Sequence, residues 1–271
     1  MTMELSQAVA RTHATQPPGT LRQGAGEPLV LLHGVTGSAS MWRHVLPRLA
    51  TDFDTLALTL LGHRGGRQPT SQPVRVRDLI DDAERSLDEL GLDTAHLAGN
   101  SLGGWVALEL ARRGRARSVC ALSPAGVWDP AQRTTSRGTL KRVARTTAAT
   151  RAILPWVARM AWVRRFGLRE NAAHGERVTA QELVDLADDM LGCVVRDDLL
   201  ATDESLTPLR AHCPITIAWC AKDRLFPVAQ HEPLARAWFP EARFLRLDDV
   251  GHVPMMDDAA LVARTIREAT R

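Results

Sequence analysis

Short apolar runs and longer runs with helical spacing follow one another along most of this 271-residue chain. Continuous apolar runs of a few residues are typical of strands buried on both faces. Apolar residues at three- and four-residue steps instead indicate helices that bury one face. Strands are therefore predicted over 28–32, 55–60, 95–98, 117–122, 215–220 and 242–247, and helices over about 40–50, 76–90, 105–111, 230–238 and 258–269.

This alternation is interrupted once, between residues 130 and 207, where the pattern is helical and contains no convincing strand. Alternating strands and helices predict a mainly parallel sheet with helices on both faces. We therefore expect an α/β core domain made of residues 1–129 and 208–271, with residues 130–207 inserted as a helical unit. Residues 16–19 predict a turn, and the short pieces on either side are expected to form a hairpin at the sheet edge.

Composition places the chain among ordinary folded proteins, because hydrophobic residues make up 45% of it and the net charge is only +3. No basic run is interleaved with aromatic residues, so no nucleic-acid partner is expected. No stretch approaches the roughly 18 apolar residues of a membrane span, so no stable membrane insertion is expected. The N-terminus lacks the apolar core of a signal peptide, and the four cysteines lack pairing or metal spacing. A reducing, cytoplasmic location is therefore expected.

The five residues Gly99-Asn100-Ser101-Leu102-Gly103 stand between a predicted strand and a predicted helix. A Gly-x-Ser-x-Gly pattern in that position is typical of a nucleophile elbow, a sharp turn that exposes the serine hydroxyl. Side chains two residues before or after the serine would collide in such a turn, which explains both glycines. Taken alone, the pattern also fits an ordinary glycine-rich turn.

A serine becomes a nucleophile only when a histidine takes its proton and a carboxylate orients that histidine. Asp223 follows the predicted strand 215–220, and His252 follows the predicted strand 242–247. Each of them alone also fits a turn aspartate or a packing histidine. Together with Ser101 they come after the carboxyl ends of three parallel strands, in the order Ser, Asp, His. The sequence therefore predicts a catalytic triad of Ser101, Asp223 and His252.

These motifs, over the whole length of the chain, resemble the α/β-hydrolase superfamily; the matching residues are His33-Gly34, Gly37-Ser38, Gly99 to Gly103, Lys222-Asp223 and Gly251-His252. The resemblance implies an eight-stranded sheet, an inserted helical cap, and an oxyanion hole formed by the N–H groups of Val35 and Leu102. It implies no cofactor and no metal. His33 is expected to orient its loop rather than to act as a base. Relatives of the dehalogenase type use an aspartate nucleophile, so Ser101 argues against carbon–halogen chemistry.

The expected cap is unevenly charged, with ten basic residues and no acidic one between Gln132 and Arg169. Such a face could attract an anionic substrate or touch a membrane surface, or it could simply be a solvated surface. From Glu170 to Glu204 the charge turns acidic, so the two halves could pair with each other. The expected substrate contacts are Trp42, Trp156 and Val253, although Trp42 fits helix-to-sheet packing equally well.

The sequence therefore predicts a serine hydrolase that cleaves a carboxylic ester, or a related acyl bond, through an acyl-enzyme. The expected partner is a small-molecule acyl substrate. A thioesterase or a carbon–carbon bond hydrolase would use the same triad, and the motifs do not separate them. A non-hydrolytic cyclase or a ligand-binding homologue could share the fold, although an intact triad argues against both. The oligomeric state is not readable from these patterns.

Overall fold

The structure is a computed structural model that describes residues 16–210 and 212–271. Residues 1–15 lie outside the described residues. They include one arm of the expected edge hairpin and the segment expected not to be a signal peptide. Across the described part of the chain, none of the helices is both long and apolar enough to span a bilayer.

One seven-stranded sheet forms the centre of the molecule, in the order β1-β3-β2-β4-β5-β6-β7. Strand β1 (Leu21–Gln23) runs antiparallel to β3 (Phe53–Leu58). The remaining strands are β2 (Glu27–Leu32), β4 (Ala95–Asn100), β5 (Ala116–Leu122), β6 (Ile215–Cys220) and β7 (Arg243–Leu247). All other neighbouring pairs, from β3–β2 to β6–β7 in the order given, are parallel. The predicted α/β class with a mainly parallel sheet is confirmed. The described residues form seven strands where eight were expected, and the other arm of the expected edge hairpin lies outside them.

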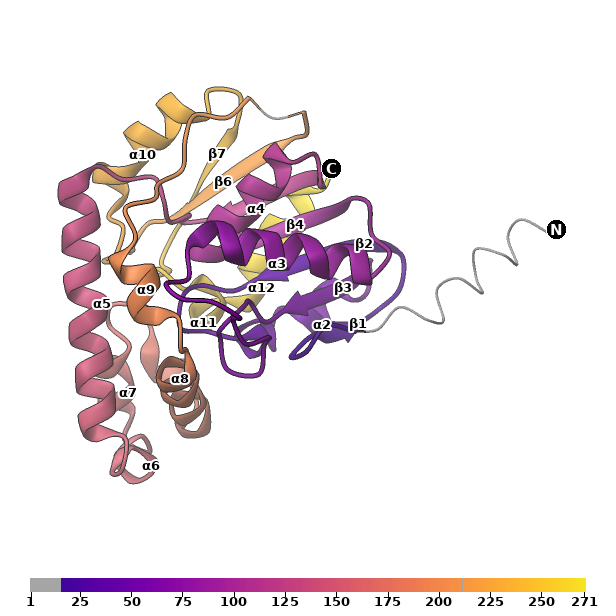
Figure 1. The fold of residues 1–271 in the computed structure, drawn as a ribbon. Coiled ribbons are helices and arrows are strands. Elements are labelled where there is room, and N and C mark those ends of the chain that lie inside the picture. Colours follow the sequence, from indigo (N-terminus) through magenta and orange to yellow (C-terminus); the bar gives the residue numbers. More distant parts are fainter. Residues whose placement is uncertain (1–15, 211) are drawn as a thin grey trace.

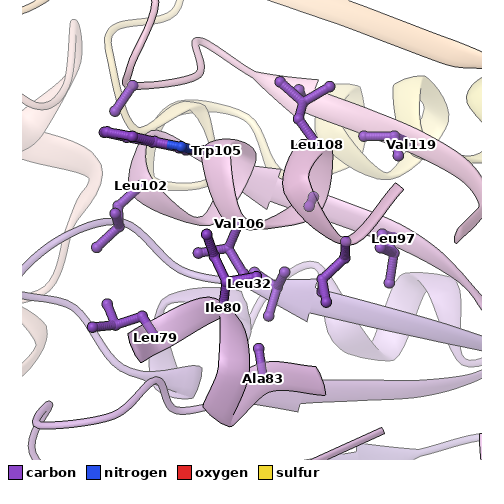
Figure 2. Close-up of a cluster of buried hydrophobic side chains, with 14 of the residues drawn as sticks. Leu32, Leu79, Ile80, Ala83, Leu97, Leu102, Trp105, Val106, Leu108 and Val119 are labelled. Carbon is purple, nitrogen blue, oxygen red and sulfur yellow. The ribbon is translucent and has the colours of Figure 1, made fainter. Parts of the chain in front are cut away.

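Helices cover both faces of this sheet (Figure 1). Successive strand residues point to opposite faces, so Val30 and Leu32 pack into one core while Leu29 and Leu31 pack into the other. The first core is closed by α3 (Val76–Glu89), α4 (Leu102–Arg112) and α10 (Val228–Trp238), and the second by α2 (Leu46–Leu49) and α12 (Ala259–Ala269). Figure 2 shows side chains of the first core, with α3 and α4 contributing Leu79 and Val106.

Two local predictions differ from the structure. The helix expected over 40–50 is divided into a 3-10 helix η2 (Ala39–Trp42) and the short α2. Pro47 explains the division, because proline has no N–H and its ring clashes with the preceding turn, so it fits only the start of α2. A short helix α11 (Pro254–Asp257), which the pattern did not indicate, follows His252.

Between β5 and β6, the part of the chain that the structure describes is helical and contains no strand, as predicted. The elements of this helical segment are α5 (Pro130–Thr150), α6 (Leu154–Val157), α7 (Ala161–Gly167), η3 (Gly175–Arg177), α8 (Ala180–Gly192) and α9 (Arg196–Ala201). Figure 1 shows it gathered beside one end of the sheet. It has a small core of its own, which includes Leu154 and Leu183. Arg151 at the end of α5 pairs with Asp188 on α8 at 2.6 Å, so the basic and acidic halves do contact each other.

Candidate active site

The strand order brings two loops together at the carboxyl end of the sheet. The chain leaves β2 for β3 on one side and later returns to place β4 on the other side of β2. Beyond such a reversal of strand order the two connections continue in opposite directions, which leaves room for a ligand between them. Because β2 and β4 are neighbours, the loop after β2 begins beside the elbow after β4, and a Cβ atom added to Gly34 would be only 3.3 Å from Ser101 Cβ.

Ser101 occupies a backbone conformation that few non-glycine residues adopt, with φ +55° and ψ −117°. It is the residue before the first turn of α4, and it is almost completely buried. A Cβ on Gly99 would overlap the backbone of Gly103, and a Cβ on Gly103 would overlap the carbonyl oxygen of Leu32. The sharp turn therefore requires glycine at both positions, as the sequence pattern predicted.

Two backbone N–H groups beside Ser101 are available to a ligand. Leu102 is the first residue of α4, so its N–H has no partner within the helix. In the loop after β2, Thr36 has φ +65° and Gly37 donates to the Gly34 carbonyl at 3.1 Å, which makes a tight turn around Val35. The Val35 N–H donates no hydrogen bond among the described residues. Val35, Ser101 and Leu102 line the same pocket, so both donors are near the serine.

His252 and Asp223 form a buried hydrogen-bonded pair, with 2.7 Å between His252 Nδ1 and Asp223 Oδ2. Their side chains are 4% and 0% exposed. The other carboxylate oxygen of Asp223 accepts the N–H groups of Leu225 at 2.9 Å and Phe226 at 2.7 Å. Because a carboxylate can only accept, Nδ1 carries the proton of the neutral ring, and Nε2 is then the nitrogen with the lone pair. His252 Nε2 is buried and has no hydrogen-bond partner within residues 16–210 and 212–271, Ser101 included.

Two further residues hold the histidine loop, and sequence patterns did not reveal them. The Asn100 Nδ2 group donates to the backbone carbonyl of His252 at 2.8 Å, which ties the elbow to that loop. The Asp257 carboxylate accepts the N–H of Gly251 at 2.7 Å, together with those of Ala173 and His174 in the helical segment. Asn100 stood at a variable position of the motif and Asp257 in an unpredicted helix, so neither carried a signal.

His33 behaves as a fixed, neutral part of the loop after β2. Its Nδ1 donates to the Gly34 carbonyl at 2.7 Å, and its Nε2 accepts the Leu60 N–H at 3.0 Å. Burial, with His63 beside it at a ring distance of 4.8 Å, holds the pKa of His33 well below its usual value. Both ring nitrogens are occupied, which agrees with the predicted loop-orienting role and leaves no free base.

A pocket of about 520 Å³, which opens to solvent, contains Ser101. Its walls come from the loop after β2, α4, the segment after β5, α5 and α9; they include Val35, Trp105, Trp128, Leu140 and Leu199. The described residues contain no cluster of three or more His, Cys, Asp or Glu side chains that could hold a metal ion.

The three predicted substrate contacts lie away from this pocket. Trp42 is fully buried in the core on the α12 face of the sheet, and Val253 packs into that same core. Trp156 is 65% exposed on the short helix α6. Residues that do line the pocket, such as Trp128 and Phe226, come from the segments after β5 and β6 rather than from the loop after β2, and only the folded arrangement brings them to Ser101.

Comparison with known proteins agrees with this architecture. A sequence model described as "Alpha/beta hydrolase family" matches residues 29–265. Epoxide hydrolase EphH of Mycobacterium tuberculosis is 34% identical over 195 residues, which cover 69% of this chain and 91% of that protein. The dihydrolipoyllysine-residue acetyltransferase component of an acetoin cleaving system from Pseudomonas putida is 31% identical over 88% of this chain, which spans only 61% of that protein. A thermophilic esterase from Thermogutta terrifontis superposes with a TM-score of 0.70 at 22% identity, over 93% of this chain and 92% of its own.

We expect Gly103→Ala to lower the free energy of unfolding by at least about 2 kcal/mol, because the new methyl group must displace the β2 backbone at Leu32. Urea denaturation measures the change. Gly138→Ala is the matched control: Gly138 lies within α5 with open space around it, so alanine should raise the stability by up to about 1 kcal/mol. Equal stability of the Gly103→Ala variant and the wild type would contradict the close packing at the elbow.

His63 should make the protein sensitive to mild acid. Burial lowers the pKa of His63 to about 4, while an unfolded histidine has a pKa near 6.5. Between these two pH values the unfolded chain binds a proton that the folded protein does not, and this favours unfolding. Stability is therefore complete above about pH 6.5 and falls by about 3 kcal/mol as the pH falls to about 4. In His63→Asn the amide can still donate to the Leu61 carbonyl but does not titrate. Urea midpoints at about pH 7 and pH 4.5, which bracket most of this window, should differ less in the variant than in the wild type; identical pH dependence would contradict the assignment.

Proposed function

The chain belongs to the alpha/beta hydrolase family, and from that membership we propose that it cleaves a carboxylic ester, or a related acyl bond, with Ser101, His252 and Asp223. The observation that carries the proposal is the state of His252. Its Nδ1 is held by a buried carboxylate, and its Nε2 is left as a buried base, unpartnered among the described residues, at the end of the sheet where Ser101 stands. A histidine in that state is poised to accept one proton.

In the proposed reaction, Ser101 Oγ attacks the carbonyl carbon of the substrate while His252 Nε2 takes its proton. The carbonyl oxygen becomes an oxyanion, which the N–H groups of Val35 and Leu102 stabilise together with the N-terminal end of α4. Asp223 stabilises the charged imidazole that forms. His252 then gives its proton to the leaving group, and water activated by the same nitrogen hydrolyses the acyl-enzyme.

We further propose that residues 130–207 act as a cap over this site. The α5 and α9 residues Leu140, Leu199 and Leu200 line the pocket with Ser101, which supports a role of the helical segment as part of its wall. Limiting access of water strengthens the electrostatic interactions within the pocket. In this arrangement the core supplies the chemistry, and the cap shares with the core the surface that a substrate contacts.

A serine nucleophile favours a carbonyl substrate over an epoxide, although one relative is named an epoxide hydrolase. Opening an epoxide with Ser101 would leave an ether, which has no carbonyl carbon for water to attack in a second step. The chain also contains no tyrosine that could protonate the opened oxygen. A thioester or a suitably activated carbon–carbon bond would form the same acyl-enzyme and is the alternative substrate class. A purely ligand-binding role would not need the His252 Nε2 that is unpartnered among the described residues.

Ser101→Ala should abolish hydrolysis of simple esters, with a loss in kcat of at least about 10⁴-fold, and should leave the fold intact. Release of alcohol or acid from esters measures turnover, with thioesters and epoxides assayed in parallel. Wild-type protein should be labelled by a fluorophosphonate at Ser101, and the variant should not. Comparable activity of the variant, or folded wild type that resists labelling and hydrolyses only epoxides, would overturn the serine mechanism.

Asp223→Asn should lower kcat by about 10³–10⁴-fold, because the amide would donate to His252 Nδ1 and force the wrong tautomer on the ring. Asp249→Asn is the control, since this exposed carboxylate lies in the loop before His252 and asparagine tolerates its φ of +61°. Steady-state kinetics on one ester compares the two variants. A similar loss in both, or no loss in Asp223→Asn, would argue against the orienting role of Asp223.

A further inference from the structure

One wall of the Ser101 pocket carries two positive charges on a single helix. Arg133 and Arg137 are four residues apart on α5, hence on one face of the helix, and both line the pocket. Neither forms an ion pair among the described residues, whereas most other arginines of the chain do. Like charges at this spacing repel each other, so placing the two guanidinium groups together costs free energy unless an anion offsets it.

Three nitrogen donors on this wall lack acceptors within the described chain. They are Arg133 Nε, Arg137 Nη2 and Trp128 Nε1, and all three are buried. Arg133 has one bond, from Nη1 to the Asp203 carbonyl at 2.7 Å, while Arg137 makes none with the described residues. Buried N–H groups without acceptors are unfavourable, and several of them around one pocket indicate a ligand that supplies oxygen atoms.

Nearby carboxylates do not fill this role. Glu204 accepts the Val76 N–H at 2.8 Å and the Thr202 hydroxyl at 2.7 Å, so its charge is directed to the start of α3. Asp203 offers Arg133 its backbone carbonyl, and its carboxylate forms no ion pair with any residue that the structure describes. Burial and the neighbouring Arg133 lower the pKa of Arg137, only partly offset by Asp203, which agrees with a net positive wall.

The position of α5 is fixed by the loop that carries Asp223. Ser136, between the two arginines, donates its hydroxyl to the Leu225 carbonyl at 3.2 Å. At the start of the helix, the Gln132 amide donates to the Gln230 carbonyl at 2.9 Å. Both arginines are therefore held at a defined place relative to the proposed triad. The rest of the lining is largely apolar, with Val35, Leu140 and Phe226 among it.

We propose that Arg133, Arg137 and the Trp128 indole N–H form a subsite for a carboxylate, so that the preferred substrate is an ester carrying a free carboxylate beyond a short apolar chain. This inference rests on the proposed ester hydrolysis. Two guanidinium groups and an indole provide the planar, charge-assisted donors that a carboxylate binds well. The apolar walls accommodate the chain between that carboxylate and the scissile carbonyl at Ser101.

The test compares monomethyl esters of straight-chain dicarboxylic acids, from four to eight carbons, with their neutral dimethyl esters. Wild type should prefer the monoester of one chain length by at least about 10-fold in kcat/KM, because hydrogen bonds to charged groups are stronger than neutral ones. Arg137→Gln should remove most of this preference by raising the KM of the monoester, so that the ratio of kcat/KM between monoester and dimethyl ester falls toward one. Arg137→Lys, which keeps the charge, should retain part of it.

Arg142→Gln is the matched control, because Arg142 is an exposed arginine on the same helix and does not line the pocket. An equal loss in Arg142→Gln would assign the preference to the overall charge of the helical segment and overturn the subsite. The subsite is also overturned if Arg133→Gln and Arg137→Gln, singly and together, leave the ratio of monoester to diester unchanged.

Binding separates failure of the subsite from failure of the proposed reaction. Calorimetry with the Ser101→Ala variant should show the monoester binding at least about 10-fold more tightly than the diester, and adding Arg137→Gln should abolish the difference. If wild type hydrolyses neither ester but this binding difference is present, the reaction is wrong and the subsite stands. If both esters are hydrolysed and no variant changes binding, the subsite is wrong and the reaction stands.

Discussion

The close approach of three backbone segments at Ser101 is the constraint on which the rest of the site depends. The end of β2, the end of β4 and the first turn of α4 come nearer to one another than side chains permit, and Gly99 and Gly103 make that possible, with Gly34 fitting tightly beside Ser101. The same contacts hold Ser101 at φ +55°, where its side chain projects from the turn rather than along the strand. They also place the N–H groups of Val35 and Leu102 near it. A strained residue persists only where the surrounding structure over-determines it, and here two buried cores provide that support.

A second constraint is electrostatic, and it explains the arrangement around His252. A buried carboxylate is unfavourable unless its oxygens are hydrogen-bonded. Asp223 receives two backbone N–H groups and the imidazole, so it can stay charged without contact with water. The histidine loop is in turn fixed by Asn100 and Asp257, which bind backbone atoms rather than the ring. The ring therefore keeps one nitrogen for Asp223 and the other for the proposed chemistry, and its position depends on residues outside the pocket lining.

Features that depend on local spacing were predictable from the sequence. Apolar periodicity predicted six of the strands and the break in alternation, because each strand or helix must bury its own face whatever its partners. The elbow and the order of Ser101, Asp223 and His252 were predictable for a similar reason, since parallel strands bring their carboxyl ends to one edge. Long-range packing was not: the exposure of Trp156, the burial of Trp42 and the bond from Asn100 to the His252 loop all depend on which segments meet across the fold. Pro47 carried a local signal for the divided helix, but the apolar spacing over 40–50 hid it.

The basic character of the helical segment shows how structure refines a sequence pattern. Ten basic residues lie between Gln132 and Arg169, and the count alone describes a uniformly charged surface. In the fold these basic residues differ in the groups that they contact. Arg151 is neutralised by Asp188, Arg164 donates to backbone carbonyls, and Arg142 faces solvent. Among the described residues, only Arg133 and Arg137 combine a place in the pocket wall with buried, unpartnered guanidinium donors. In the proposed enzyme, specificity for charge would therefore depend less on the net charge of residues 130–207 than on Arg133 and Arg137, because cations without a protein partner gain most from an anionic ligand.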